Sequence, residues 1–238
     1  LGSPHSKVRE VSEFLSSVDC DRLIMNGDII DGWQLHNSDD KWNSSHSAFF
    51  RVIMKMMENH STEVIYVSGN HDDFLDPIVP SKLFNISFVS EYILREEKHS
   101  YVVIHGHAFD SITARFRWIS RLGDIVYNLL LKFNNMWNRA RMRHGKEYYS
   151  FSKVIKHKVK QAVSLISGFE SDLESFARAR GCDGIICGHI HNPEDKMLKG
   201  GIHYLNSGDW VESLSALVED FDGNWRIFRY NDFVKPQP

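Results

Sequence analysis

The sequence has few of the residues that cross-link or anchor a chain. It contains only three cysteines, Cys20, Cys182 and Cys187, an odd number whose spacing matches neither a zinc site nor a disulfide framework. No apolar run approaches the length that a helix needs to cross a bilayer, and no signal peptide is visible. We therefore expect a protein of a reducing compartment, the cytoplasm.

Negative charge is scarce in one part of the chain. The formal net charge of all 238 residues is −3. Residues 111–168, however, hold 12 Lys and Arg against 2 Asp and Glu, so this block carries a net charge of +10. Such a block suggests a binding surface for an anion, either phosphate or a lipid headgroup, and the alternative is a solvated helix face. We expect no nucleic-acid partner, and the sequence leaves the oligomeric state open.

What the chain does have is an ordinary globular composition, with 42% hydrophobic and 25% charged residues. Five short apolar runs rich in β-branched or aromatic residues each predict a strand buried on both faces: 23–25, 64–67, 101–104, 184–187 and 203–205. Each run is followed by residues that bind metals, in the segments 27–31, 69–72, 105–107, 188–191 and 206–209. Ligands at the carboxyl ends of several strands converge on one crevice, as in open α/β sheets.

Helical patterns alternate with these strands. Apolar residues at helical spacing predict helices over 8–18 and 45–59, and two further strand-like stretches cover 86–89 and 92–94. This alternation favours a layered α/β domain. From 111 to 180 the pattern changes to long helical periodicity without proline, which predicts a helical insertion between two parts of the core, 1–110 and 181–238.

Oxygen and imidazole ligands without cysteine suit a divalent ion such as Mn²⁺, Zn²⁺ or Fe²⁺. Asp28 suits a bridge between two ions because a carboxylate has two oxygens, and the alternative is an aspartate of a turn or helix cap. His189 and His191 point to the same side of an extended segment, so both imidazoles can enter one cluster. His105 directly ends its strand and is a further ligand candidate, whereas His107, two residues on, would support the ligands.

The segment Gly69-Asn70-His71-Asp72 carries the most specific chemistry. The amide oxygen of Asn70 can bind a metal without adding charge, and His71 can act as a general acid. The alternative is a plain turn through Asn-x-Asp. Asp31 and Asp72 are expected to support the ligands from neighbouring positions.

Taken in chain order, four motifs resemble those of the calcineurin-like metallophosphoesterase superfamily: Gly-Asp-x-x-Asp, Gly-Asn-His-Asp, His-Gly and Gly-His-x-His. The resemblance implies two packed mixed β-sheets flanked by helices, an αββα sandwich, with two divalent metals at the strand ends. It also implies metal-dependent hydrolysis of a phosphoric ester or anhydride. In this family pattern Asp28 bridges the metals and His71 contacts the phosphate as an acid. The remaining ligands are Asn70, His105 and His189 at the second metal and His191 at the first.

A closer resemblance is to the bacterial UDP-2,3-diacylglucosamine pyrophosphatase branch of lipid A synthesis. It is carried by residues 105–110 followed by the basic insertion, by 188–193 and by 206–212. It implies that the insertion caps the site and holds acyl chains, and that the products are UMP and an acylated glucosamine 1-phosphate. Among the candidate metals we expect Mn²⁺ first, with Zn²⁺ or Fe²⁺ as alternatives. The candidate substrate-binding residues are six arginines of the insertion: Arg115, Arg117, Arg121, Arg139, Arg141 and Arg143.

The insertion also predicts peripheral contact with a membrane. Its basic charge beside Trp118 and Trp137 fits a helix that lies on an anionic surface such as the inner membrane, and the alternative is a helix packed on its own domain.

One departure from the family pattern concerns the first strand. The superfamily begins with an Asp-x-His motif that supplies two ligands to the first metal, and this sequence opens at Leu1-Gly2, residues that typically follow that motif. We expect the chain to be a fragment of an active enzyme. Two other interpretations remain: a soluble phosphodiesterase or nucleotide pyrophosphatase without a lipid substrate, and a non-catalytic member that binds a lipid or a partner through its basic face.

Overall fold

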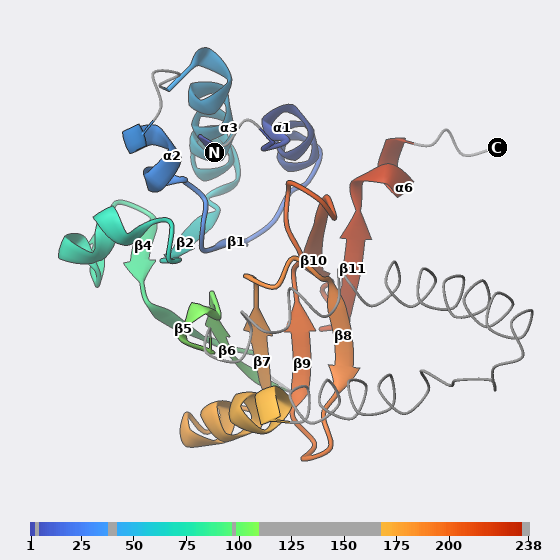
Figure 1. Ribbon diagram of the computed structural model, residues 1–238. Coiled ribbons are helices and arrows are strands. Elements are labelled where there is room, and N and C mark those ends of the chain that lie inside the picture. The colour runs from blue at the N-terminus through green and yellow to red at the C-terminus, as the bar shows by residue number, and fades with distance from the viewer. Residues whose placement is uncertain (3–4, 38–41, 97–98, 110–167, 235–238) are drawn as a thin grey trace, which may run out of the picture. The chain divides into compact units, whose positions relative to one another are not determined.

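Helices and strands alternate along the chain in the computed structural model, which describes residues 1–2, 5–37, 42–96, 99–109 and 168–234 (Figure 1). The chain divides into two compact units, one formed by Leu1–His107 and Glu174–Pro238 and the other by Ala108–Leu173. Most of the expected insertion at 111–180 lies outside the described residues. Of its last residues, 168–179 form a helix.

Four strands form the first sheet, sheet A. They are β1 (Arg22–Asn26), β2 (Glu63–Val67), β3 (Ser81–Leu83) and β4 (Ile86–Val89), in the order β1-β2-β4-β3. β1, β2 and β4 run parallel, whereas β3 is antiparallel to β4. The parallel strands therefore present their carboxyl ends at one edge of the sheet.

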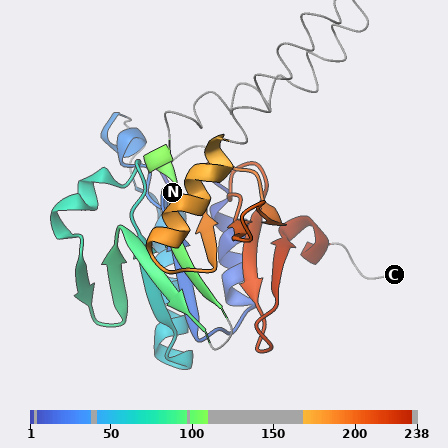
Figure 2. The ribbon, with the colours of Figure 1, turned by 90° about the horizontal axis from the view of Figure 1, so that it is seen from below.

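Five strands form the second sheet, sheet B. They are β5 (Glu91–Arg95), β6 (Ser100–Ile104), β7 (Gly184–Cys187), β8 (Glu194–Met197) and β9 (His203–Asn206), in the order β5-β6-β7-β9-β8. The central strands β6, β7 and β9 are parallel, and the two edge strands are antiparallel to them. A separate antiparallel hairpin, β10 (Ser215–Glu219) and β11 (Trp225–Arg229), lies beside β8 (orange and red in Figure 2).

Two long helices cover one face of sheet A. α1 (Val8–Ser16) and α3 (Ser44–His60) lie side by side (Figure 1) and place Phe14 and Ile53 in one core cluster with Val64 and Tyr66 of β2. Asn43 caps the N-terminus of α3, because its side chain accepts hydrogen bonds from two main-chain N–H groups of the first turn. The shorter helices are α2 (Gly32–Asn37), η1 (Asp73–Ile78), η2 (His107–Phe109) and α6 (Tyr230–Val234).

The alternation of side chains along β2 packs the two sheets together. Val64 and Tyr66 face the helices, whereas Ile65 and Val67 belong to a second core cluster with Val103 and other buried residues of sheet B. This arrangement confirms the predicted α/β class, in which two mixed sheets pack together and helices lie outside. Within the described residues, no helix is long and apolar enough to cross a membrane.

The prediction that every strand would be buried on both faces is wrong for β1. Of its five residues only Met25 is buried, whereas all four residues of β7 are. The reason is position: β1 lies at the edge of sheet A with one neighbouring strand, and β7 lies in the middle of sheet B. An apolar run of this kind does not distinguish the two positions.

The core between the sheets gives a stability test. Leu205 on β9 is fully buried in the cluster between the sheets, so Leu205→Ala should lower the free energy of unfolding by about 2–5 kcal/mol. Leu83, an exposed leucine on β3, is the matched control, and Leu83→Ala should stay within about 0.5 kcal/mol of the parent. Urea denaturation followed by circular dichroism measures both, and equal effects would contradict the assigned core.

Candidate metal centre

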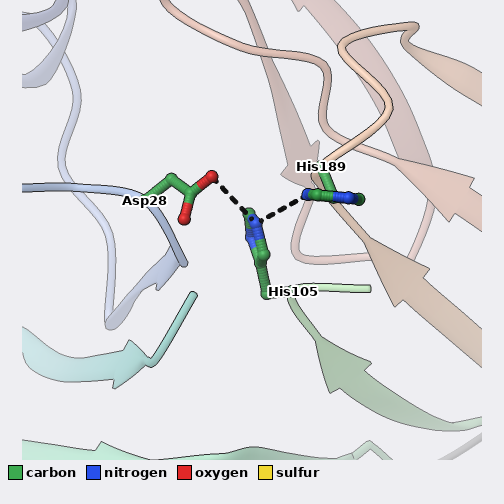
Figure 3. Close-up of side chains that lie close together, drawn as sticks. All are labelled: Asp28, His105 and His189. Atoms are coloured by element: carbon green, nitrogen blue, oxygen red, sulfur yellow. Dashed lines mark hydrogen bonds and ion pairs between the residues drawn. The ribbon is translucent and has the colours of Figure 1, made fainter. Parts of the chain in front are cut away.

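Three side chains meet where their strands end. Asp28 follows β1 of sheet A, whereas His105 and His189 follow β6 and β7, which are parallel neighbours in sheet B. His105 Nε2 lies 3.1 Å from Asp28 Oδ2 and 3.2 Å from His189 Nδ1 (Figure 3). One ligand atom of each residue lies within 4.8 Å of the others, which is compatible with three ligands of one ion.

The hydrogen bonds of His105 leave one ring nitrogen for a metal. Nδ1 lies 3.0 Å from the main-chain oxygen of Asn26 and donates its proton to it. Nε2 therefore directs its lone pair at the Asp28 carboxylate. Because the lone pair and the carboxylate oxygen are both acceptors, a cation or a second proton must lie between them. Burial lowers the pKa of His105, but the hydrogen bond and the negative charge of Asp28 outweigh burial and raise it. The pair thus attracts a positive charge.

A buried amide oxygen fits the same chemistry. Asn70 follows β2, and its Oδ1 is buried without a hydrogen-bond partner among the described residues. An acceptor left unpaired in a protein interior costs about 1–3 kcal/mol. A divalent ion would satisfy it, because carbonyl oxygens are good ligands of ions such as Mn²⁺. The residues present therefore fit a metal.

Asp28 is held in its ionised form. Its Oδ1 accepts a hydrogen bond of 2.9 Å from the main-chain N–H of His71, and its Oδ2 faces His105. Burial raises the pKa of Asp28, but the interactions with His105 and His71 lower it to about 2. At neutral pH the carboxylate is therefore charged, and His71 and His105 fix the positions of its two oxygens.

The backbone around these residues adopts conformations that side chains rarely allow. Asp28, His189 and His191 have positive φ angles of 54°, 62° and 61°. Strain of this kind persists where the surrounding structure imposes it, and it is concentrated at functional sites. All three positions were candidate ligands on sequence grounds.

Two glycines leave room for the ligands. A Cβ atom at Gly27 would lie 2.2 Å from His105 Nδ1, and one at Gly69 would lie 2.3 Å from Asp28 Oδ1. Gly27 also has a φ of 75°, which only glycine adopts without cost. Gly27, before Asp28, and Gly69, before Asn70, are thus part of the site.

His71 lies beside the three-residue cluster and is held in place by its neighbours. Its Nδ1 is 3.1 Å from Asp31 Oδ1, and its ring centroid is 4.3 Å from that of Trp33. Because Asp31 engages Nδ1, Nε2 is the nitrogen that can exchange a proton with a substrate. This geometry agrees with the predicted role of His71, which stays a prediction.

Asp72 connects the two loops that carry Asp28 and His71. It is fully buried and accepts hydrogen bonds from Tyr66 Oη at 2.8 Å, from the main chain of Ile30 at 2.9 Å and from that of Gly69 at 3.2 Å. Burial raises the pKa of Asp72 in spite of these donors. These contacts agree with the supporting role expected of Asp72, which stays a prediction.

The predicted ligand His191 is oriented by a carboxylate. Its Nδ1 lies 2.9 Å from Asp209 Oδ2, and Asp209 also accepts a hydrogen bond of 2.7 Å from the main chain of Ser213. Burial raises the pKa of Asp209, but the bonds from His191 and Ser213 lower it to about 2. A carboxylate on the second ring nitrogen is a common feature of metal-binding histidines. His191 itself is not one of the three residues whose ligand atoms converge.

The remaining predicted residues are His107 and the six arginines of the insertion. His107 is exposed on η2, although its ring centroid is only 5.7 Å from that of His105. The six arginines proposed to bind substrate lie outside the described residues.

The roles of three groups at the site were not predicted, although Asp209 ends one of the segments expected to bind metals. Asp209 orients His191, the main-chain oxygen of Asn26 orients His105, and Tyr66 bonds to Asp72. Asp209 could have been found, because it ends the segment 206–209 that follows a buried strand. Neither a main-chain oxygen nor a tyrosine within an apolar strand leaves a signal in the sequence.

Comparison with known proteins identifies the family. A model of the calcineurin-like phosphoesterase family matches residues 2–193. The chain belongs to this family. It is therefore a metal-dependent phosphoester hydrolase, and the interpretation as a non-catalytic binding protein is set aside. No curated protein matches the sequence.

Several solved structures resemble this phosphoesterase at low identity. An archaeal phosphodiesterase is 13% identical with a TM-score of 0.45, and the match covers 93% of this chain and 90% of the other. A Vps29 mutant from Entamoeba histolytica is 12% identical with a TM-score of 0.41, over 95% and 92% of the two chains. A predicted phosphoesterase from Streptococcus pneumoniae is 14% identical with a TM-score of 0.38, over 94% and 92%. The family assignment rests on the sequence match alone.

The tight fit at Gly27 can be tested through metal binding. Gly27→Ala places a methyl group against the ring of His105 and should weaken Mn²⁺ binding by about 10- to 100-fold, as loss of support for a metal ligand does. Gly201→Ala is the matched control, because Gly201 has a similar φ of 82° and no atom near its Cβ position. Isothermal titration with Mn²⁺ measures both, and equal weakening would attribute the effect to backbone strain alone.

Proposed function

We propose that this phosphoesterase cleaves the pyrophosphate bond of UDP-2,3-diacylglucosamine, giving UMP and an acylated glucosamine 1-phosphate. The proposal rests on one observation above all: Asp28, His105 and His189 converge beside His71, which Asp31 holds in place. Such a site suits attack on a phosphorus atom. The lipid-linked substrate is supported by the motif resemblance at 105–110 and 206–212 and by the net charge of +10 on residues 111–168.

The residues named above would hold two divalent ions, of which Mn²⁺ is our first choice and Zn²⁺ or Fe²⁺ the alternatives. Asp28 would contact both ions, Asn70, His105 and His189 would bind one, and His191 would bind the other. When bound, such ions lower the pKa of a water ligand and polarise phosphoryl oxygens.

The protein's own side chains would orient the substrate and hold the proton that is transferred. Asp28 stays ionised and keeps its two oxygens fixed by His71 and His105, so the anionic part of the site needs no rearrangement. With its Nδ1 on Asp31, His71 would hold a proton on Nε2 and stabilise the charge that develops on a phosphoryl oxygen.

We further propose that the basic insertion recognises the substrate at an anionic membrane surface, with the six arginines as its contacts. The enzyme would then be a peripheral protein of the bacterial inner membrane on its cytoplasmic side. The charge of residues 111–168 supports this proposal, because surface charge attracts anionic headgroups and salt weakens that attraction.

His71 provides the first test. His71→Ala should lower kcat by about 10²- to 10⁴-fold, the usual contribution of a general acid, and should change the affinity for Mn²⁺ little. His60→Ala is the matched control, since His60 is an exposed histidine whose Nε2 lies 3.2 Å from Asp19 Oδ1. Steady-state kinetics and Mn²⁺ titration give the two readouts. An equal loss of both would make His71 a ligand.

The substrate is tested by phosphorus NMR with Mn²⁺ and UDP-2,3-diacylglucosamine in anionic vesicles. Release of UMP, at a rate that falls as salt rises, is the expected result. Hydrolysis of a simple phosphodiester without release of UMP would instead support the second interpretation, a phosphodiesterase without a lipid substrate. A rate independent of salt would contradict the electrostatic part of the proposal.

A further inference from the structure

A hollow of about 650 Å³ lies next to the proposed catalytic residue, and the mechanism does not use it. It is formed by the loop before α2, by α2 itself, by Trp42 and by η1. Its lining residues are Ile30, Gly32, Trp33, Leu35, Trp42, Asp73 and Phe74. The volume is in the range of small-molecule sites.

The hollow is connected to the metal centre through one residue. His71 donates its main-chain N–H to Asp28 at 2.9 Å, and its main-chain oxygen accepts a hydrogen bond of 3.1 Å from the N–H of Gly32. The rings of His71 and Trp33 stack at 31° with their centroids 4.3 Å apart. His71 therefore contacts both the metal centre and the wall of the hollow, and one substrate could reach both.

The hollow is lined by aromatic rings that are exposed and yet fixed. Trp33, Trp42 and Phe74 are 48%, 42% and 50% exposed. The indole N–H of Trp33 donates to Asp73 Oδ2 at 3.3 Å, and that of Trp42 donates to Ser47 Oγ at 2.9 Å. Partly exposed rings that are held by their polar edge can stack flat ligands at little cost in side-chain entropy.

The negative charge of Asp73 in the lining distinguishes an acyl chain from a planar heterocycle as the occupant. An acyl chain in the hollow would remove the Asp73 carboxylate from water and offer it no hydrogen bond, which is unfavourable. A planar heterocycle can stack on the rings and present its own N–H to a carboxylate. The combination of stacking faces with one acceptor therefore favours a nucleobase.

We propose that this hollow binds the base of the nucleotide whose phosphate reaches the metal centre, with Trp33 and Phe74 as the stacking residues. The inference rests on the proposed function, in which that base is the uracil of the UDP group. In this proposal the hollow selects the nucleotide, and the acyl chains bind elsewhere on the protein.

Calorimetric titration of the Mn²⁺-loaded full chain with UMP and with ribose 5-phosphate tests the proposal, since the two ligands differ only by the base. Trp33→Ala should weaken UMP binding by about 10- to 100-fold and ribose 5-phosphate binding far less, because only base stacking is lost. Phe74→Ala, at the second proposed stacking residue, should likewise weaken UMP binding more than ribose 5-phosphate binding. Phe84→Ala, at an exposed phenylalanine between β3 and β4, is the control and should change neither.

Two outcomes would overturn the base site. One is equal weakening of both ligands in Trp33→Ala, which would make Trp33 a support of His71 only. The other is unchanged UMP binding together with weaker binding of diacylglucosamine 1-phosphate, which would place an acyl chain in the hollow. Failure of the proposed function looks different: UDP-2,3-diacylglucosamine would not be cleaved, while Trp33→Ala would still lose UMP selectively.

Discussion

The contact between Asp28 and His105 is the interaction on which the site depends. A carboxylate from the end of sheet A meets a buried imidazole from the end of sheet B, with 3.1 Å between Oδ2 and Nε2. Neither residue has freedom to turn away: His71 fixes the other carboxylate oxygen, and the Asn26 main chain fixes the other ring nitrogen. The glycine at 27 and the left-handed backbone at 28 are the local conditions for this approach.

The rest of the site is organised around the same loop. Asp72 accepts hydrogen bonds from both the Asp28 loop and the turn that carries His71, so the candidate ligand and the candidate acid are positioned together. His71 then connects the metal centre to the aromatic hollow at Trp33. The candidate acid and the proposed base site thus share one short segment of chain, and a displacement of that segment would affect both.

The sequence predicts the parts of this structure that have a strong local pattern. The runs 64–67 and 184–187 fall within β2 and β7, and residues that directly follow such strands, Asp28, His105 and His189, do converge. The exposed edge strands β3 and β8 were missed because short polar segments carry no periodicity. The hollow was missed for another reason: it depends on Trp33 stacking against a residue from a distant turn, and no spacing in the sequence encodes that.

The placement of the site between the two sheets has a consequence for folding. An ion held by Asp28 of sheet A and by His105 and His189 of sheet B would act as a cross-link between the two halves of the core. Since the unfolded chain does not bring these residues together, any ion bound there stabilises the native state by mass action, in proportion to the logarithm of its concentration. Metal supply in the cell would then set not only how much of the enzyme is active but also how long the folded enzyme survives.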